Sequence, residues 1–287
     1  MELKFCPLFS GSSGNALYVG CGKMNLLVDA GLSGSRITAE LQKIGVDGRD
    51  LDGILVTHEH ADHCAGVGVL SRRYNLPVYA TEGTWAGMAG RLGRIDEKNR
   101  RYFEAGEDFF LEGLNVTPFP IPHDANDPVG FSFCAGGVKL SVATDLGCIQ
   151  EGWMSRLEGS DLVLLESNHD VEMLKAGPYP YDLKHRVLSR RGHLSNEDAG
   201  RALVELTRRG VRHALLGHLS GENNFPELAY ETVALALREQ GIAPGADVGL
   251  GLARRDGMSG LYVLSDGCAP VRMDANAARY TLEVAGR

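Results

Sequence analysis

The sequence predicts an α/β fold in which two β-sheets are packed between outer layers of helices. Short apolar runs bounded by Gly, Pro and Asp recur along the chain and alternate with helical patterns of ten to fifteen residues. Because strands in both halves are followed by helices, two sheets covered by helical layers are expected. No low-complexity linker or repeat divides the chain, so residues 1–287 are expected to form a single domain.

The individual elements follow from apolar runs and from periodicity. Strands are predicted over Ala16–Val19, Asn25–Asp29, Gly53–Thr57, Pro77–Ala80, Asn115–Pro120, Gly130–Cys134, Val138–Thr144, Asp161–Glu166, His213–Gly217 and Gly260–Leu264. Helices are predicted over Arg36–Ile44, His63–Tyr74, Asn196–Arg209 and Pro226–Gln240. The Gly-rich segment after Ala243, GADVGLGLARRDG, is expected to be an exposed connection into the last strand.

Composition narrows the class of protein only slightly. The formal net charge of −8 argues against a nonspecific coat on nucleic acid but allows a basic cleft in an acidic body. The chain has no positively charged start followed by an apolar run and no stretch of about 20 apolar residues, so a cytoplasmic protein is expected. Its six cysteines are scattered singly, which favours reduced thiols; Cys64, next to His63, is more typical of a packed residue than of a ligand.

The central chemical signal is the segment THEHADH, which follows the apolar run GILV. In an extended chain, residues two apart point to one side, so His58, His60 and Asp62 can converge, while a helix start presents His63. Imidazole and carboxylate are ligands that Zn²⁺, Mn²⁺ or Fe²⁺ accept at sites that keep a position open for water. The alternative is an exposed polar turn with incidental histidines.

The segment HEHADH matches the HxHxDH signature of the metallo-β-lactamase superfamily, and four further segments resemble its other motifs in order. The resemblance implies the four-layer αββα sandwich of that superfamily. It also implies two divalent metal ions, Zn or Mn with Fe as a further option. The implied roles are an orienting Asp29 in LLVDAG, a first metal on His58, His60 and His123, a second on Asp62, His63 and His218, and a bridging Asp145.

A dinuclear centre of this kind activates a shared water and hydrolyses esters, thioesters, amides or phosphodiesters. Which bond is cut depends on the residues around the metals. In RGHLSN, His193 resembles a histidine of the ribonuclease Z-like branch that donates a proton from outside the metal ligands, although a helix-start role beside Ser195 remains open. In LLESNHD, Glu166 resembles a carboxylate that orients such a histidine, and His169 is either part of that motif or a surface helix cap. Asp62, Glu166 and His193 are therefore the expected catalytic residues.

Two further segments favour nucleic acid. The basic stretch LKHRVLSRRGHLS places Lys184, Arg186, Arg190 and Arg191 directly before His193, where they suit phosphate oxygens, although a solvated helical face explains the same charges. In the Ser/Gly segment 10–15, Ser12, Ser13 and Asn15 are weaker candidates for phosphate contacts, and a tight hairpin explains them equally well.

The whole set of motifs resembles the YycJ (or WalJ) group of bacterial exonucleases. That resemblance implies 5′-to-3′ digestion of double-stranded DNA, with a role in DNA repair. A thioesterase or lactonase of the same fold would share every metal ligand but would need a roomy apolar pocket and neither the Arg-rich segment nor His193. A non-catalytic metal-binding scaffold would be expected to lack a ligand, and none is missing. The sequence leaves open which metal is bound, whether the substrate is DNA or RNA, and what the oligomeric state is.

Overall fold

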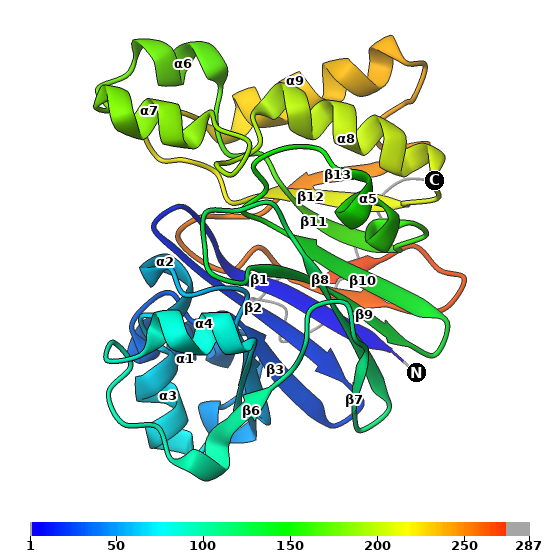
Figure 1. Ribbon diagram of the computed structural model, residues 1–287. Coiled ribbons are helices and arrows are strands. Elements are labelled where there is room, and N and C mark those ends of the chain that lie inside the picture. Colours follow the sequence, from blue (N-terminus) through cyan, green and yellow to red (C-terminus); the bar gives the residue numbers. More distant parts are fainter. Residues whose placement is uncertain (1, 274–287) are drawn as a thin grey trace.

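A computed structural model describes residues 2–273 and shows two β-sheets packed face to face, with helices on both outer sides (Figure 1). This arrangement confirms the expected four-layer αββα sandwich. Among the described residues, no helix is long and apolar enough to cross a membrane. That the whole chain forms one domain stays a prediction.

The first sheet has eight strands in the order β15-β14-β1-β2-β3-β4-β5-β6. They are β1 (Leu3–Gly11), β2 (Gly14–Cys21), β3 (Met24–Val28), β4 (Gly53–Leu55), β5 (Val78–Ala80), β6 (Arg100–Tyr102), β14 (Leu261–Leu264) and β15 (Val271–Met273). Neighbouring strands from β15 to β3 run antiparallel, whereas β3, β4, β5 and β6 run parallel.

The second sheet has seven strands in the order β13-β12-β11-β10-β9-β8-β7. They are β7 (Phe109–Leu111), β8 (Leu114–Pro120), β9 (Val129–Ala135), β10 (Val138–Ala143), β11 (Leu162–Glu166), β12 (His213–Gly217) and β13 (Gly249–Leu252). Strands β10 to β13 are parallel, and β7 to β10 are antiparallel.

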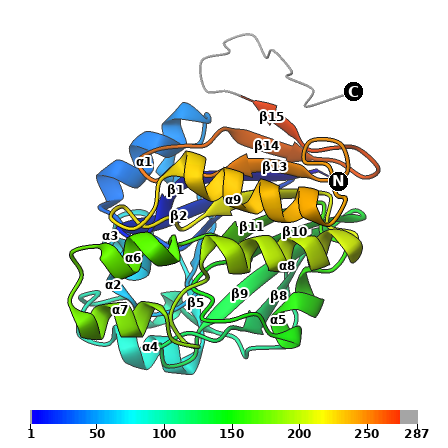
Figure 2. The same ribbon diagram turned by 90° about the horizontal axis from the view of Figure 1, so that it is seen from above.

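Helices cover the outer face of each sheet. The first sheet is flanked by α1 (Gly34–Lys43), α2 (Ala61–Cys64), α3 (Val67–Tyr74) and α4 (Glu82–Met88), with the short 3₁₀ helices η1 (Gly48–Asp50) and η2 (Glu97–Asn99) in its connections. The second sheet is covered by α5 (Glu151–Leu157), α8 (Asn196–Arg208) and α9 (Pro226–Glu239). The remaining pair, α6 (Val171–Ala176) and α7 (Tyr181–Val187), lies beyond the end of the second sheet (Figures 1 and 2).

Helix α8 illustrates how local sequence and packing agree. The Ser195 side chain accepts a hydrogen bond from the backbone of Asp198 and so caps the first turn. Glu197 and Asp198 add negative charge where the helix dipole is positive. Leu203 and Leu206 are fully buried against the second sheet, so the helix is held by packing as well as by its cap.

Three apolar layers account for the sandwich. Between the two sheets, Phe5 and Val19 of the first sheet belong to the same buried cluster as Phe131 and Leu164 of the second. A second cluster joins the outer face of the first sheet to α1, α3 and α4, and a third joins the second sheet to α5, α8 and α9. The central cluster contains residues from both halves of the chain. Close packing in this cluster fixes the position of one sheet relative to the other, and with it the positions of the loops at their edge.

The carboxyl ends of the parallel strands decide where polar side chains collect. In an open parallel sheet, the loops that follow the strands gather at one edge. Here the segments after β3, β4, β10, β11 and β12 carry most of the histidines and buried carboxylates of the chain. The fold therefore brings residues that are far apart in sequence to a common edge of the two sheets.

The segment after Ala243 corrects one prediction, because part of it is not an exposed connection. Residues 249–252 form β13, which pairs in parallel with β12. The glycines that suggested a loop instead allow close packing: a Cβ atom on Gly249 would lie 2.1 Å from Cδ2 of His213. The expected helix over residues 63–74 is also divided, into α2 and α3. Gly66, between them, packs so closely that a Cβ atom there would lie 2.1 Å from the carbonyl oxygen of Leu32.

We predict that Gly249→Ala lowers the free energy of unfolding by about 2 kcal/mol, because the new methyl group overlaps the His213 ring. The measurement is urea denaturation of the single variants, Gly249→Ala and His213→Ala, and of the double variant. The methyl group should cost much less in the His213→Ala background. Equal costs in both backgrounds would contradict this account of β13.

Candidate metal centre

The loop after β4 and the start of α2 present four of the predicted ligands. His58 is fully buried, and His60 is the N-cap residue of α2 with extended backbone. Asp62 and His63 lie in the four-residue helix itself. The extended stretch followed by a helix start is the local geometry that the spacing of the histidines predicted.

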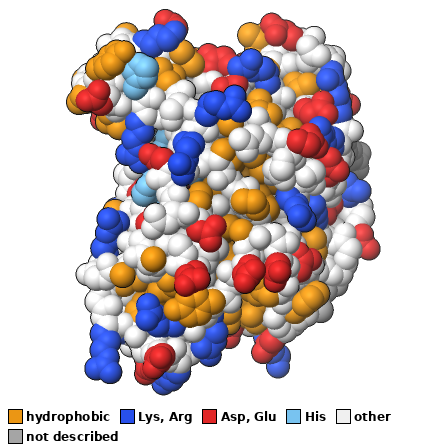
Figure 3. Space-filling view, viewed as in Figure 1, with side chains coloured by type: hydrophobic (Ala, Val, Ile, Leu, Met, Phe, Trp, Pro, Cys, Tyr) orange, Lys and Arg blue, Asp and Glu red, His pale blue; other side chains and the backbone are white. Residues whose placement is uncertain are grey.

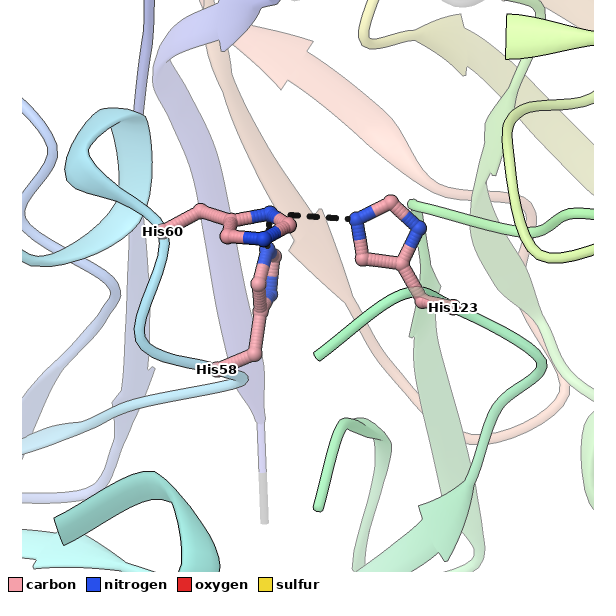
Figure 4. Close-up of side chains that lie close together, drawn as sticks. All are labelled: His58, His60 and His123. Atoms are coloured by element: carbon pink, nitrogen blue, oxygen red, sulfur yellow. Dashed lines mark hydrogen bonds between the residues drawn. The ribbon is translucent and has the colours of Figure 1, made fainter. Parts of the chain in front are cut away.

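Three imidazoles form the first ligand group (Figure 4). The His58 Nε2 atom lies 3.0 Å from Nδ1 of His60. The His123 Nε2 atom, from the loop after β8, lies 3.2 Å from the same Nδ1 atom. Three ring nitrogens converging from two loops have the composition of a metal site with three histidine ligands.

The second ligand group contains Asp62, His63 and His218, with Asp145 beside it. The His63 Nε2 atom lies 3.5 Å from Oδ2 of Asp62 and 3.3 Å from Oδ2 of Asp145. The His218 Nε2 atom lies 3.7 Å from Oδ2 of Asp62 and 3.5 Å from Oδ1 of Asp145. Asp145 also approaches the first group, since its Oδ1 lies 3.6 Å from Nε2 of His123. The expected bridging position of Asp145 is therefore compatible with the geometry.

Three residues at strand ends share an uncommon backbone conformation. Asp29, Asp145 and His218 directly follow or nearly follow β3, β10 and β12, and their φ angles are 62°, 60° and 55°. Left-handed backbone is unfavourable for residues with a Cβ atom, and it is retained where surrounding contacts fix it. In each case the turn directs a carboxylate or imidazole toward the ligand groups.

Asp29 holds the loop of the motif in place. Its Oδ1 accepts from the backbone N–H of Thr57, and its Oδ2 accepts from the Thr57 hydroxyl, both at 2.8 Å. Oδ2 also lies 2.8 Å from Nδ1 of His63. Because Nδ1 of His63 donates to a carboxylate, the lone pair of its Nε2 atom faces Asp62 and Asp145.

Glu166 performs the same task for two histidines at once. Its Oε1 lies 2.8 Å from Nδ1 of His193 and 2.9 Å from Nδ1 of His218, and its Oε2 accepts from the backbone N–H groups of Leu146 and Leu194. Burial raises the pKa of this carboxyl, but the charge and hydrogen bonds of His193 and His218 bring it down to about 2. Glu166 is thus an anion that fixes both rings through one atom.

The donor set fits divalent metal ions. The Oδ2 atom of Asp145 and the Nε2 atom of His218 are buried and have no hydrogen-bond partner among the described residues. Burial and the nearby His63 hold the pKa of His58 well below its usual value, so that its ring is neutral, as metal ligation requires. Burial also lowers the pKa of His218, but Asp145, Asp62 and Glu166 raise it to about 10, which shows how strongly this position favours a positive charge.

The predicted basic residues lie near the ligand groups but differ in their contacts. Arg186 forms an ion pair with Asp124, and the Arg191 Nε atom donates to the carbonyl of His123 at 2.9 Å. Lys184 donates to the carbonyl of Lys175. Arg190 and Arg191 line a cavity of about 480 Å³ that also includes His123. On the face shown in Figure 3, Lys and Arg side chains are spread over both flanks and are interspersed with Asp and Glu. Their binding of nucleic acid stays a prediction.

The predicted residues of the Ser/Gly segment lie in two different environments. Asn15 is buried, its Nδ2 lies 3.1 Å from Nε2 of His63, and it also donates to the carbonyls of Gly11 and Asp62. Its amide therefore supports the loop of the second ligand group. Ser12 and Ser13 are exposed in the turn between β1 and β2.

Around the ligands, Asn168 and Ser10 were not predicted as site residues, whereas His169 and Cys64 were discussed from the sequence. The Asn168 amide donates to the carbonyl of His218 at 2.9 Å, and the Ser10 hydroxyl accepts from the His218 backbone. His169 is buried rather than a surface cap, since Asp170 caps α6. Cys64 is packed, and its thiol donates to the carbonyl of Glu59. Only the position of Asn168 two residues after Glu166 in the segment LLESNHD could have suggested its role.

We predict that Asp29→Asn weakens metal binding about 10- to 100-fold, because an amide N–H in place of Oδ2 opposes the Nδ1–H of His63. Competition with a chromogenic chelator measures the affinity. Asp52→Asn is the matched control, since Asp52 accepts a hydrogen bond from the Asn25 backbone on the exposed side of β3. Equal metal affinity in both variants would remove Asp29 from this positioning role.

Comparisons with known proteins agree with this site. A model of the beta-lactamase superfamily domain matches residues 24–219. The chain is 42% identical to the exodeoxyribonuclease YycJ of Bacillus anthracis over 245 residues, which cover 85% of this chain and 93% of that protein. It is also 42% identical to the exodeoxyribonuclease WalJ of Streptococcus pneumoniae serotype 2 over 246 residues, covering 85% and 91%.

Solved structures of low sequence identity share the fold. The metallo-beta-lactamase fold protein YhfI from Bacillus subtilis superposes with a TM-score of 0.67 at 16% identity, covering 92% of this chain and 99% of that one. Zn²⁺-bound PqqB from Methylobacterium extorquens superposes with a TM-score of 0.62 at 21% identity, covering 92% and 100%. From the matched domain, the relatives and the ligand geometry, it follows that this chain belongs to the metallo-β-lactamase superfamily, is a hydrolase of that superfamily, and falls in the group of the exodeoxyribonucleases YycJ and WalJ.

Proposed function

We propose that this protein is a dinuclear metal-dependent phosphodiesterase that digests double-stranded DNA from its ends in the 5′-to-3′ direction and acts in DNA repair. The observation that carries the proposal is the position of His193. Its ring lies outside the two groups described above, although it also forms a further possible ligand group with Asp145, Glu166 and His218. Its Nδ1 is held by Glu166, and its centroid lies 5.1 Å from that of His123 and 5.3 Å from that of His218. A proton donor fixed beside a metal centre suits departure of an alkoxide from phosphorus.

Two metal ions are proposed, Zn or Mn, with Fe as a further option. The residues that would hold them are His58, His60 and His123 for one ion, and Asp62, His63 and His218 for the other, with Asp145 shared. When bound, such ions activate water and stabilise the charge of the reacting phosphate. Asp62 thereby counts among the proposed catalytic residues through its contact with the metal.

The chain's own residues set the protonation of the reacting groups. Because Nδ1 of His193 donates to Glu166, the Nε2 atom is the position from which a proton can pass to the leaving oxygen. The His193 side chain is 18% exposed, so a substrate can reach it. Glu166 cannot move without also releasing His218, which couples the proton donor to the metal ligands.

The relatives and two arginines support the proposed substrate, and the cysteines support the proposed cellular location. YycJ and WalJ are named exodeoxyribonucleases, and we extend DNA as substrate to this chain. Arg190 and Arg191 supply cations beside His123, where a phosphate backbone could pass. A cytoplasmic location is supported by the free thiols of Cys6, Cys64, Cys134, Cys148 and Cys268, which a reducing compartment preserves.

The decisive experiment compares linear 5′-labelled duplex DNA with a covalently closed circle, using protein reloaded with Mn²⁺ or Zn²⁺ after chelation. We expect metal-dependent loss of the linear form alone, and release of label first. Digestion of the circle would exclude restriction to ends. Inactivity on both, together with turnover of a thioester or lactone, would replace this proposal with a small-molecule hydrolase.

The ligand and proton-donor roles predict different defects. Asp145→Ala should lose metal and activity together, because it removes the carboxylate nearest to both ligand groups. His193→Ala should keep its metal content while turnover falls about 10²- to 10⁴-fold. Metal analysis and single-turnover digestion of the same preparations separate the two. Full activity of His193→Ala would refute the proton-donor role.

Arg190 gives a cleaner test of nucleic-acid binding than Arg191, whose guanidinium supports the His123 loop. We predict that Arg190→Glu weakens duplex binding and lowers the slope of log affinity against log salt by about 1. Arg201→Glu makes the same charge change on α8, away from the strand ends, and should bind as the unaltered protein does. Fluorescence anisotropy over a salt series measures both, and an unchanged slope for Arg190→Glu would count against the contact.

A further inference from the structure

The Glu59 side chain connects the two loops that carry the first ligand group. Glu59 stands between His58 and His60 in the loop after β4, and it is 8% exposed. Its Oε1 atom accepts a hydrogen bond of 2.9 Å from the backbone N–H of Asn126, in the loop after β8. That loop also carries His123, three residues earlier. The carboxylate therefore links the two ligands of one loop to the ligand of the other without involving a ligand ring.

Other hydrogen bonds hold the loop after β8 at different places. The Nδ1 atom of His123 lies 3.1 Å from the carbonyl oxygen of Gly192, which belongs to the second sheet's side of the centre. The backbone N–H of Val129 donates to the carbonyl of Thr57 at 3.0 Å and joins the two sheets at the start of β9. Val129 is six residues beyond His123, whereas the Glu59 contact is three residues beyond it. Glu59 therefore holds the part of the loop closer to the ligand.

Helix α4 packs over the Glu59 side chain. A Cβ atom on Gly87 of this helix would lie 2.4 Å from Cγ of Glu59, so a larger residue at Gly87 would displace the glutamate. The Asn126 side-chain amide donates to the carbonyl of Gly83 at 3.3 Å, and Nη1 of Arg91 donates to the carbonyl of Glu59 at 3.4 Å. The glutamate, α4 and the loop after β8 therefore form one packed unit beside the first ligand group.

Glu59 has a free-energy cost that packing alone does not explain. Its Oε2 atom is buried and has no hydrogen-bond partner among the described residues. A buried polar atom without a partner is unfavourable, and a leucine would fill a similar volume without that cost. A leucine could not accept from the Asn126 N–H, however. Because such locally unfavourable choices are typical of functional positions, the acceptor at Oε1 is the property that distinguishes a glutamate here.

The nitrogens that the two loops bring together have nearly the separation of ligands on one ion. Nitrogens bound to a tetrahedral Zn²⁺ at about 2.0 to 2.1 Å lie roughly 3.3 Å from one another. The Nδ1 atom of His60 lies 3.0 Å from Nε2 of His58 and 3.2 Å from Nε2 of His123. A contact that keeps the two loops at this distance therefore contributes to metal affinity.

Resting on the dinuclear centre proposed above, we infer that Glu59 is a positioning residue for the first metal ion, which it serves by fixing the distance between the two ligand loops through the Asn126 N–H. Ligands that are already in place bind an ion more tightly, because less free energy is lost in ordering the loops. The histidines of the second group are oriented by other residues, Asp29 and Glu166. Loss of the Glu59 acceptor therefore weakens the first site more than the second.

The test compares Glu59→Gln, whose amide oxygen can still accept from Asn126, with Glu59→Leu, which cannot accept. Each is also combined with His218→Ala, which removes a ligand of the second group, so that the remaining tight equivalent of Zn²⁺ reports on the first site. We expect Glu59→Leu to bind that equivalent about 10- to 100-fold more weakly, and Glu59→Gln to stay within about threefold of the Glu59 protein. Competition with a chromogenic chelator measures the affinity. Glu82→Leu makes the same change at an exposed position of α4 and should leave both sites unaltered.

Hydrogen exchange of the Asn126 backbone amide in the metal-free protein provides a second readout, which needs neither a bound ion nor nuclease activity. Exchange should be slow in the unaltered protein and in Glu59→Gln, and about tenfold or more faster in Glu59→Leu. Fast exchange in the unaltered protein would overturn the inference even if Glu59→Leu failed to fold. Melting temperatures near that of the unaltered protein confirm that each variant is folded.

The affinities contain two further outcomes that would overturn the role of Glu59. One is a Glu59→Gln protein that binds the first ion as weakly as Glu59→Leu, because the retained acceptor would then have no effect. The other is an equal loss of affinity at both sites in Glu59→Leu. Failure of the proposed function looks different: the unaltered protein would then cut no duplex, whereas binding and exchange would still decide what Glu59 does.

Discussion

The site depends on keeping three carboxylates charged inside the protein. Asp29, Asp145 and Glu166 are each no more than 2% exposed, and a buried charge without partners is strongly unfavourable. Asp29 and Glu166 are satisfied by hydrogen bonds from Thr57, from backbone N–H groups and from histidines. Asp145 differs, because its Oδ2 atom has no hydrogen-bond partner among the described residues. A divalent ion would supply the missing partner of this Asp145 oxygen. The surrounding histidine rings converge on the same place.

The two carboxylates with satisfied hydrogen bonds fix the orientation of the histidine rings beside them. Asp29 and Glu166 each accept from the Nδ1 atom of a histidine, and so direct the Nε2 atoms of His63 and His218 toward Asp145. Glu166 uses the same oxygen for His193, so the proposed proton donor is coupled to the predicted ligand His218. A change at Glu166 would therefore affect metal binding and proton transfer together, which makes its separate contribution measurable only through double variants.

The α6–α7 pair is tied to the candidate metal centre through Arg186 and Asp124. Arg186 was expected to bind nucleic acid, yet its main partner is Asp124 beside a metal ligand. Asn15 shows a related contrast, since a residue expected to contact phosphate instead supports the His63 loop with its buried amide. In both cases the residue type was informative, but the partner depended on neighbours from distant parts of the chain.

The sequence by itself predicted the fold class and most of the strands, and it named as candidate ligands residues that the structure brings together. Apolar runs and the two-residue spacing in HEHADH are local patterns, and they translate directly into strand, extended loop and helix start. Only the tertiary structure decided that Gly249–Leu252 is a strand, because its glycines reflect packing against His213 rather than a turn. The sharing of one Glu166 oxygen by His193 and His218 was likewise decided by the tertiary structure. These residues have no common spacing, and they meet because strand ends converge in space, which local patterns do not encode.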